Sequence, residues 1–191
     1  MVRTDSTTVR RRFFAPEVVQ TSATDCGPAT LKCLLEGFGI PISYGRLREA
    51  CQTDVDGTSI DTMEEIAAQL GLEAEQTILP LDHLVLPEAR ALPAIVVVCL
   101  PNGLTHFVVA WRTHGRLVQV MDPAIGRRWM SGRQFLSEVD QHRMPIAASA
   151  WREWAGTDEF LGAFRLRLRG LGVSARAQAR LIEARSATRV G

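Results

Sequence analysis

The chain of 191 residues has almost no lysine and lacks the segments that mark several large classes of protein. Lys32 is the only lysine, a bias that we assign to coding preference rather than to function. No apolar run reaches the length of a membrane span, since the longest extends only from Ala94 to Leu100. A GxxxxGK(S/T) phosphate loop is also missing, which excludes ATP binding by that route.

Metal-ligand spacing is absent as well. The four cysteines, at positions 26, 33, 51 and 99, form no CxxC pair, so neither a metal nor another cofactor is expected. No secretory signal is recognisable, and we therefore expect free thiols in a reducing, cytoplasmic compartment. The net charge of +1 gives no reason to expect a nucleic-acid partner, and the arginines near both ends are interpreted as solvated helix faces.

Apolar residues recur at helical spacing in the first part of the chain and at strand spacing in the second. We therefore predict an α+β domain in which N-terminal helices pack on a C-terminal antiparallel sheet. The expected helices begin at Cys26, with Gly37 and Gly39 as stop signals, at Ser43 and at Ile60; the expected strands are 72–79 and 93–100, followed by a β-hairpin over 105–121.

Three segments follow from this pattern. Residues 1–14 are polar and arginine-rich and predict a flexible arm, whereas residues 15–145 contain the folded domain. Residues 146–191 predict a helical extension or linker, in which apolar residues from Phe160 to Leu171 alternate with arginines. The alternative for this extension is an amphipathic element that lies on an anionic membrane surface.

The stretch QTSATDCGPATLKCLLEGFG, residues 20–39, places a cysteine where a helix is expected to begin. Asp25 is the predicted N-cap, and Pro28 is compatible only with the first turn. Cys26 then lies near the free N–H groups and the positive end of the helix dipole, which favour the nucleophilic thiolate. Gly27 has no Cβ, so we expect a substrate backbone to pass close by and assign Asp25 and Gly27 to substrate binding.

The predicted hairpin carries a histidine and an aspartate. A three-residue loop over 113–115 pairs His106 with Asp122 across the two strands. A two-residue loop would instead set Asp122 against Phe107, on the opposite face from His106. We therefore predict the three-residue register, which places an imidazole and a carboxylate opposite each other.

Cysteine, histidine and acid in this chain order are the groups that a thiol peptidase or acyltransferase needs. His106 would pair with the thiol of Cys26 and later protonate the leaving amine, while Asp122 fixes the orientation of the ring. The side-chain amide of Gln20 is the right kind of donor to share an oxyanion site with the Cys26 backbone N–H, a contribution of about 3 kcal/mol to the barrier. The predicted catalytic residues are therefore Cys26, His106, Asp122 and Gln20.

The segments QTSATDCGPATLKCLLEGFG, LPAIVVV, HFVVAW and VMDPAIG resemble the papain-like cysteine peptidase domain at the N-terminus of peptidase-containing ABC exporters, the bacteriocin-processing endopeptidases. The resemblance covers residues 18–139. It places the family's nucleophile on Cys26, its base on His106, its orienting acid on Asp122 and its oxyanion donor on Gln20. It implies removal of a leader from a ribosomally made precursor peptide after a Gly-Gly or Gly-Ala motif, coupled to export.

The resemblance also implies partners and a location. The partners would be the precursor peptide and the transmembrane and ATP-binding parts of an ABC exporter, at the inner face of the cell membrane. Narrow subsites would exclude side chains before the cut, and a helical leader would lie in a groove built from the second and third helices. Two alternatives stay open, a non-catalytic leader-binding module and a papain-like acyltransferase, as does the choice between an exporter fragment and a stand-alone peptidase.

Overall fold

The computed structural model describes residues 11–53, 57–142 and 145–187. The chain divides into two compact units, with the boundary between Gln141 and His142. Unit 1, which precedes this boundary, contains a sheet with helices on both of its faces. Unit 2, which follows it, is made of helices. The sequence placed the boundary a few residues later, between 145 and 146.

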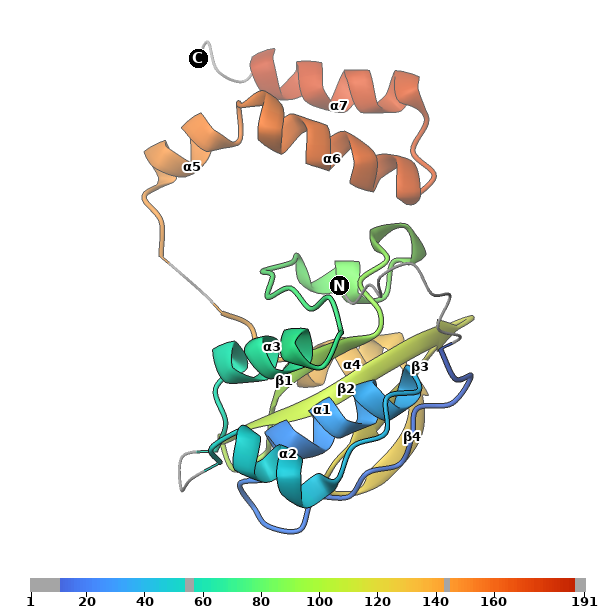
Figure 1. The fold of residues 1–191 in the computed structure, drawn as a ribbon. Coiled ribbons are helices and arrows are strands. Elements are labelled where there is room, and N and C mark those ends of the chain that lie inside the picture. Colours follow the sequence, from blue (N-terminus) through green and yellow to red (C-terminus); the bar gives the residue numbers. More distant parts are fainter. Residues whose placement is uncertain (1–10, 54–56, 143–144, 188–191) are drawn as a thin grey trace. The chain divides into compact units, whose positions relative to one another are not determined.

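Unit 1 is built around an antiparallel sheet of four strands in the order β1-β2-β3-β4 (Figure 1). The predicted strand over 93–100 and the predicted hairpin are both present, and the α+β class is confirmed. The fourth strand was not predicted. The strands are β1 (Ala94–Cys99), β2 (Thr105–His114), β3 (Leu117–Asp122) and β4 (Gly126–Ser131).

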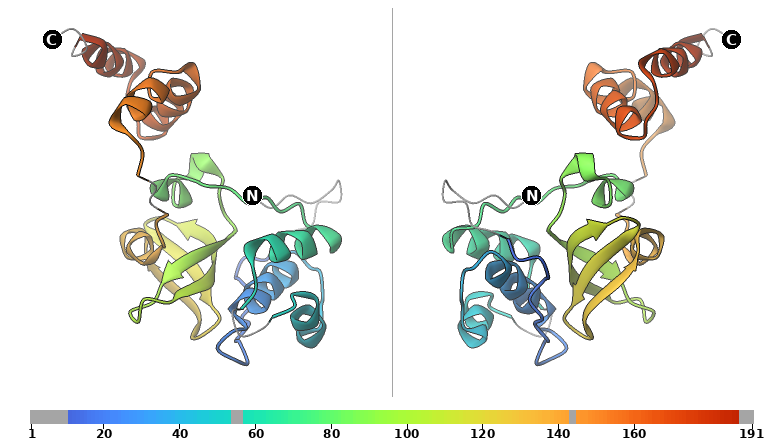
Figure 2. Two further views of the ribbon diagram at one scale, coloured as in Figure 1. Left: turned by 90° about the vertical axis from the view of Figure 1, so that its left-hand side faces the viewer. Right: turned by 90° about the vertical axis from the view of Figure 1, so that its right-hand side faces the viewer.

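Helices cover the two faces of the sheet unequally. Three of them, α1 (Cys26–Gly37), α2 (Tyr44–Ala50) and α3 (Ile60–Gln69), lie on one side, and α4 (Gly132–Glu138) lies on the other (Figure 2). Each face therefore has its own apolar core. Val109, Trp111 and Met121 pack with the first three helices, whereas Val108, Ala110 and Val120 pack with α4 and with η1 (Leu81–Leu84), which η2 (Pro87–Ala89) follows.

Helix α1 is anchored along its length by buried leucines and ends against the sheet. Leu31 and Leu35 are fully buried, and burial of each contributes about 1.5–3 kcal/mol. At the C-terminus, Gly39 has a φ of +79° and terminates the helix as predicted. Gly37 has a different role from the predicted stop signal, because a Cβ there would overlap the indole ring of Trp111.

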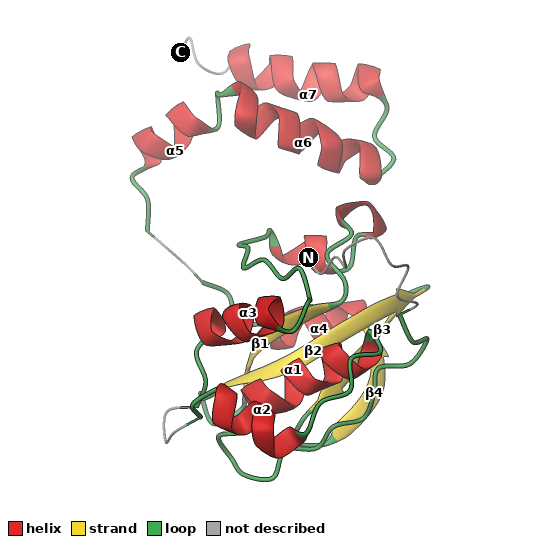
Figure 3. Cartoon of the chain, viewed as in Figure 1, coloured by secondary structure: helices red, strands yellow, loops and turns green. Residues whose placement is uncertain are grey.

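Helix α3 begins and ends where its sequence signals predict. The Ser59 hydroxyl accepts a hydrogen bond from the Thr62 backbone N–H at 3.1 Å, and Gly71 follows the helix with a φ of +88°. The strand predicted over 72–79 is wrong, since this segment runs as an irregular connection (Figure 3). Gln76 Nε2 donates to Asp61 Oδ1 at 2.8 Å, which ties the segment back to α3 instead of to the sheet.

The first residues that the structure describes are held to the domain. The Arg12 backbone N–H donates to the Gly37 carbonyl at 3.0 Å, and Trp111 Nε1–H donates to the Arg12 carbonyl at 3.1 Å. The guanidinium of Arg112 lies 4.0 Å from the centre of the Phe13 ring. Residues 11–14 therefore belong to the domain and not to a flexible arm, and the rest of the predicted arm, residues 1–10, lies outside the described residues.

Unit 2 consists of α5 (Ala148–Trp154), α6 (Asp158–Gly170) and α7 (Ala175–Ala187). Thr157 caps α6, and the predicted cap Ser174 accepts a hydrogen bond from Ala177 N–H at 3.4 Å. Trp154 lies 4.8 Å from Phe160 between ring centres, within an aromatic cluster that joins α5 to α6. Within the described residues, no helix is both long enough and apolar enough to cross a bilayer.

Candidate active site

Cys26 is the first residue of α1 and Asp25 is its N-cap residue, both as predicted, but the Asp25 side chain forms no capping hydrogen bond. Its carboxylate makes no hydrogen bond to the free N–H groups of the first turn. Instead it accepts a hydrogen bond from the Thr21 hydroxyl at 2.7 Å and pairs with Arg48 Nε of α2 at 2.9 Å. Because Asp25 is fully buried, it offers no surface to a substrate, and its assignment to substrate binding is wrong.

Gly27 is also occupied by packing within the domain. A Cβ at this position would lie 2.8 Å from Cβ of Thr58 and 3.3 Å from Sδ of Met63. The missing side chain therefore allows α1 to approach the start of α3 closely, and the space beside Gly27 is filled. The prediction that a substrate backbone uses this space is wrong.

His106 lies near the start of β2, and Asp122 is the last residue of β3. The predicted pairing of these two residues is wrong, because the strands pair Ala110 with Val120 and His114 with Leu117. A β-bulge at Trp111 shifts the register between these two pairs. The two side chains nevertheless meet, and His106 Nε2 lies 2.9 Å from Asp122 Oδ1.

The pKa of the Cys26 thiol is coupled to the neighbouring ring of His106. Burial alone would raise the pKa of Cys26, but a hydrogen bond with His106, the charge of that ring and the backbone N–H groups of Phe107 and Gly27 lower it overall. The hydrogen bond with Asp122, followed by that with Cys26, raises the pKa of His106 to about 9. The arrangement therefore favours a thiolate beside an imidazolium.

The carboxylate of Asp122 is held in its charged form. Burial alone would raise the pKa of Asp122, but His106, the Ala124 backbone N–H and the charge of Arg128 lower it overall. Ala124 N–H donates to Oδ1 at 2.9 Å. Arg128 Nη2 lies 3.6 Å from Oδ2 and 3.0 Å from Oε2 of Glu138, so its guanidinium is shared between two carboxylates.

Gln20 is joined to the same region through its backbone. Its N–H donates to the carbonyl of Pro123 at 2.9 Å, one residue after Asp122. Its side-chain oxygen is buried, and no hydrogen-bond partner for it is present among the described residues. The side-chain oxygen is therefore not committed to a contact within the described residues.

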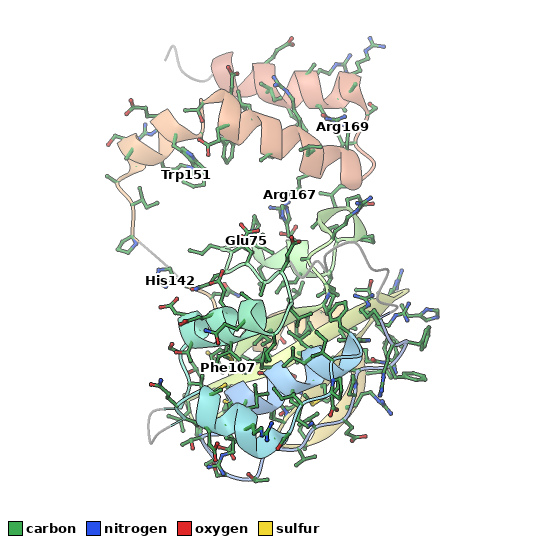
Figure 4. All side chains as sticks on the ribbon, in the orientation of Figure 1. Glu75, Phe107, His142, Trp151, Arg167 and Arg169 are labelled. Carbon is green, nitrogen blue, oxygen red and sulfur yellow. The ribbon has the colours of Figure 1, made fainter. Side chains whose placement is uncertain are left out.

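Some groups at the site had no signal in the sequence. The backbone N–H of Phe107 on β2, a residue labelled in Figure 4, contributes to lowering the pKa of Cys26. Arg128 lies on β4, a strand that the sequence pattern did not predict. Within the described residues, no cluster of three or more His, Cys, Asp or Glu side chains is arranged to hold a metal ion.

Comparison with protein families gives a match over most of unit 1. Residues 15–147 match the model of the Peptidase C39 family. The pediocin PA-1 transport/processing ATP-binding protein PedD of Pediococcus acidilactici is 30% identical over 130 residues, which are 67% of this chain and 18% of that protein. The chain spans less than a fifth of the length of the curated transport proteins that it matches.

Solved structures match the same region. The peptidase domain of Streptococcus ComA, a bifunctional ABC transporter involved in quorum sensing, has a TM-score of 0.59 and 28% sequence identity. This match covers 65% of the chain and 92% of that domain. A double glycine motif protease from an AMS/PCAT transporter, solved in complex with the leader peptide, has a TM-score of 0.53 at 22% identity and shows the shared fold.

Proposed function

Because the chain belongs to the Peptidase C39 family, we propose that it is a cysteine endopeptidase that removes the leader from ribosomally made precursor peptides after a Gly-Gly or Gly-Ala motif. The observation that carries this proposal is the 2.9 Å contact between His106 and Asp122, together with the effect of His106 in lowering the pKa of Cys26. An unreactive structural cysteine would have no need of an imidazole whose pKa is raised to about 9.

In the proposed first step, the thiolate of Cys26 attacks the carbonyl carbon of the second glycine, and the C–S bond forms as the carbonyl oxygen takes the negative charge. The backbone N–H of Cys26 and the amide of Gln20 stabilise this oxyanion. His106 then gives its proton to the departing amine of the cargo peptide, and the C–N bond breaks. Asp122 keeps Nε2 of the ring occupied, so that Nδ1 faces the sulfur.

In the second step, a water molecule attacks the thioester carbonyl. His106 takes one proton from the water, and the C–S bond breaks to return the thiolate. The leader leaves as a free acid, and the ring is again an imidazolium. The proposed chemistry uses only groups of the chain and needs no cofactor.

The proposed partners are the precursor peptide and the transmembrane and ATP-binding parts of an ABC exporter. PedD is described as a transport and processing protein, and ComA as a bifunctional transporter, which supports coupling of cleavage to export. We propose that the helical part of the leader lies on the surface formed by α2, α3 and the neighbouring sheet.

The cleavage proposal is tested with precursor peptides that carry a Gly-Gly or Gly-Ala junction between leader and cargo. Mass spectrometry should find a single cut after the second junction residue, and Cys26→Ala should abolish the cut while leader binding remains. A matched peptide with Val-Val at the junction should bind and stay intact. Binding without cleavage by the unmodified chain would instead support a leader-binding module, and transfer of the leader to an added amine would support an acyltransferase.

For unit 2 we propose contact with an anionic membrane surface at the cytoplasmic face. Trp151 and Trp154 are each 45% exposed, and arginines 165, 167 and 169 alternate with apolar residues along α6; Trp151, Arg167 and Arg169 are labelled in Figure 4. Exposed tryptophans on one helix and arginines on the next are the residue types found in helices that lie at an anionic interface.

Co-sedimentation with phosphatidylglycerol vesicles should exceed that with phosphatidylcholine vesicles. It should fall when the three α6 arginines are changed to glutamine. The matched triple variant changes the exposed arginines 46, 90 and 133 of unit 1 and should sediment like the unmodified chain. Equal loss in both triple variants would show a general effect of charge and contradict the proposal.

A further inference from the structure

A fully buried carboxylate lies one residue before the nucleophile and takes no part in the chemistry described above. Asp25 is completely covered, yet it carries an oxygen that accepts from Thr21 and another that pairs with Arg48. Burying a charged carboxylate is costly unless it is paired, so we expect the Asp25 carboxylate to have a role in the structure. Its two partners indicate that this role is to hold the backbone around Cys26 in place.

The partners of Asp25 come from two directions. Thr21 belongs to the loop over 20–25, which leads from Gln20 to the nucleophile. Arg48 belongs to α2, which packs against α1. Asp25 therefore joins this loop to helix α2 through Arg48. It also fixes the position of Thr21, the residue immediately after Gln20.

A phenol shares this cluster. Burial and the neighbouring charge of Asp25 raise the pKa of Tyr44, while contact with Thr21 acts in the opposite direction. Tyr44 is the first residue of α2, one turn before Arg48. Two residues of α2 therefore face the same loop.

The other end of the loop is fixed by a different contact. The Gln20 N–H is bound to the Pro123 carbonyl, so the backbone of Gln20 is anchored beside Asp122. Thr21 follows directly and is bound to Asp25, which is covalently joined to Cys26. Gln20 is thus held between two anchors, one next to the acid and one next to the nucleophile.

From this arrangement we propose that Asp25 is a positioning residue for the oxyanion site: through Thr21 it holds the loop over 20–25 so that the amide of Gln20 stays in place beside Cys26. The inference rests on the proposed cysteine peptidase activity. Asp25 and Thr21 act through Gln20 and touch neither the substrate nor the sulfur. Loss of the Thr21–Asp25 hydrogen bond should therefore weaken stabilisation of the transition state and leave formation of the thiolate intact.

Thr21→Val tests the proposal without disturbing the ion pair between the buried Asp25 carboxylate and the exposed Arg48. It should lower kcat for cleavage of the Gly-Gly precursor about tenfold, with little change in KM, because loosening a donor costs part of the ~10²–10³-fold that its complete removal costs. Thr21→Ser keeps the hydroxyl and should restore kcat. Ser22→Ala removes a neighbouring hydroxyl whose partner is Thr24 and should have no effect.

A double-mutant cycle separates positioning from general structural damage. In a Gln20→Ala background, Thr21→Val should cause no further loss of kcat, since the group through which it acts is already gone. The rate of Cys26 alkylation by iodoacetamide, which needs no oxyanion site, should be unchanged in Thr21→Val. Independent, additive losses in the cycle would overturn the proposal, as would slowed alkylation.

Failure of this inference is distinguishable from failure of the proposed function. If the unmodified chain cleaves the precursor and Thr21→Val cleaves it equally fast, Asp25 has no positioning role and the peptidase assignment stands. If the unmodified chain cleaves no precursor, the proposed function fails first. Arg48→Gln offers a second variant, which should reproduce the loss of kcat because it leaves Asp25 without its charged partner.

Discussion

Asp122 falls opposite Val108 in the register of β2 and β3, yet its carboxylate lies 2.9 Å from the ring of His106. Residues diagonal to each other across an antiparallel pair are close enough for long side chains to meet. They share a face here only because the bulge at Trp111 adds one residue to β2. Without this extra residue the register would turn Asp122 to the opposite face.

Asp122→Asn should lower kcat by at least about a hundredfold, with little change in the affinity for the leader. The amide can still contact Nε2, but it removes the charge that stabilises the imidazolium and permits the wrong tautomer. Precursor cleavage gives kcat, and calorimetry gives the affinity for the leader. Comparing the two measurements shows whether the variant loses turnover, affinity or both. Asp140→Asn, on the segment after α4, is the matched control and should cleave normally. A defect in affinity alone would argue against an orienting role.

The dependence of kcat/KM on pH should be bell-shaped. Its lower limb reports the lowered pKa of Cys26, below which the thiolate is protonated, and its upper limb lies at about 9, where His106 loses the proton that the leaving amine needs. In Asp122→Glu the upper limb should stay at about the same pH. In Asp122→Asn the upper limb of any residual activity should move to lower pH, because the carboxylate that raises the pKa of His106 is gone. An upper limb that did not move in Asp122→Asn would contradict the assigned cause.

The same pKa has a consequence for stability. The folded-state pKa of His106 lies above its ordinary value of 6.5, so the ring contributes stability that is fully present below that value. This contribution is lost as the pH rises through about 9. Urea unfolding at pH 6 and pH 10 should show a larger loss of stability for the unmodified chain than for His106→Ala.

Local signals explain what the sequence could predict. The start of α1 at Cys26 follows from Pro28 and from leucines at helical spacing, all of which act within a few residues. The cap of α3 at Ser59 is equally local. The chemistry of Cys26, His106 and Asp122 could likewise be proposed, since it depends on residue types and chain order.

Features that depend on distant partners could not be predicted in this way. Asp25 has the residue type of an N-cap, but its carboxylate is taken by Arg48 of another helix. No residue type marks the bulge at Trp111, which fits a regular strand equally well. The alternation over 72–79 indicates a strand, but hydrogen bonds from Gln76 to α3 compete with entry into the sheet.

Gly37→Ala should destabilise unit 1 by about 1–3 kcal/mol, because the added methyl group would overlap the buried indole of Trp111. The gain in helix propensity, at most ~1 kcal/mol, does not offset this overlap. Gly45→Ala in α2 is the matched control, since its nearest neighbour lies 4.0 Å away, and it should be neutral or stabilising. The two variants are compared by their midpoints of urea unfolding, provided that the m-value is the same in both. Equal midpoints would show that α1 can move away from the sheet at no cost in free energy of unfolding.

Iodoacetamide at neutral pH should label Cys26 faster than any other cysteine of the chain. Burial raises the pKa of Cys33 to about 12 and that of Cys51 to about 11, so both are almost entirely protonated thiols. Cys99 is exposed, but its hydrogen bond with Asp140 raises its pKa as well.

Peptide mapping after a short exposure should therefore find the label on Cys26 first. His106→Ala should slow the labelling of Cys26, because it removes the hydrogen bond and the positive charge that lower its pKa, and it should leave the rate at Cys99 unchanged. Exposure alone predicts the opposite order, since Cys99 is exposed and Cys26 only partly so. Preferential labelling of Cys99 would thus show that accessibility and not ionisation controls reactivity, and the thiolate on which the proposed peptidase depends would be absent.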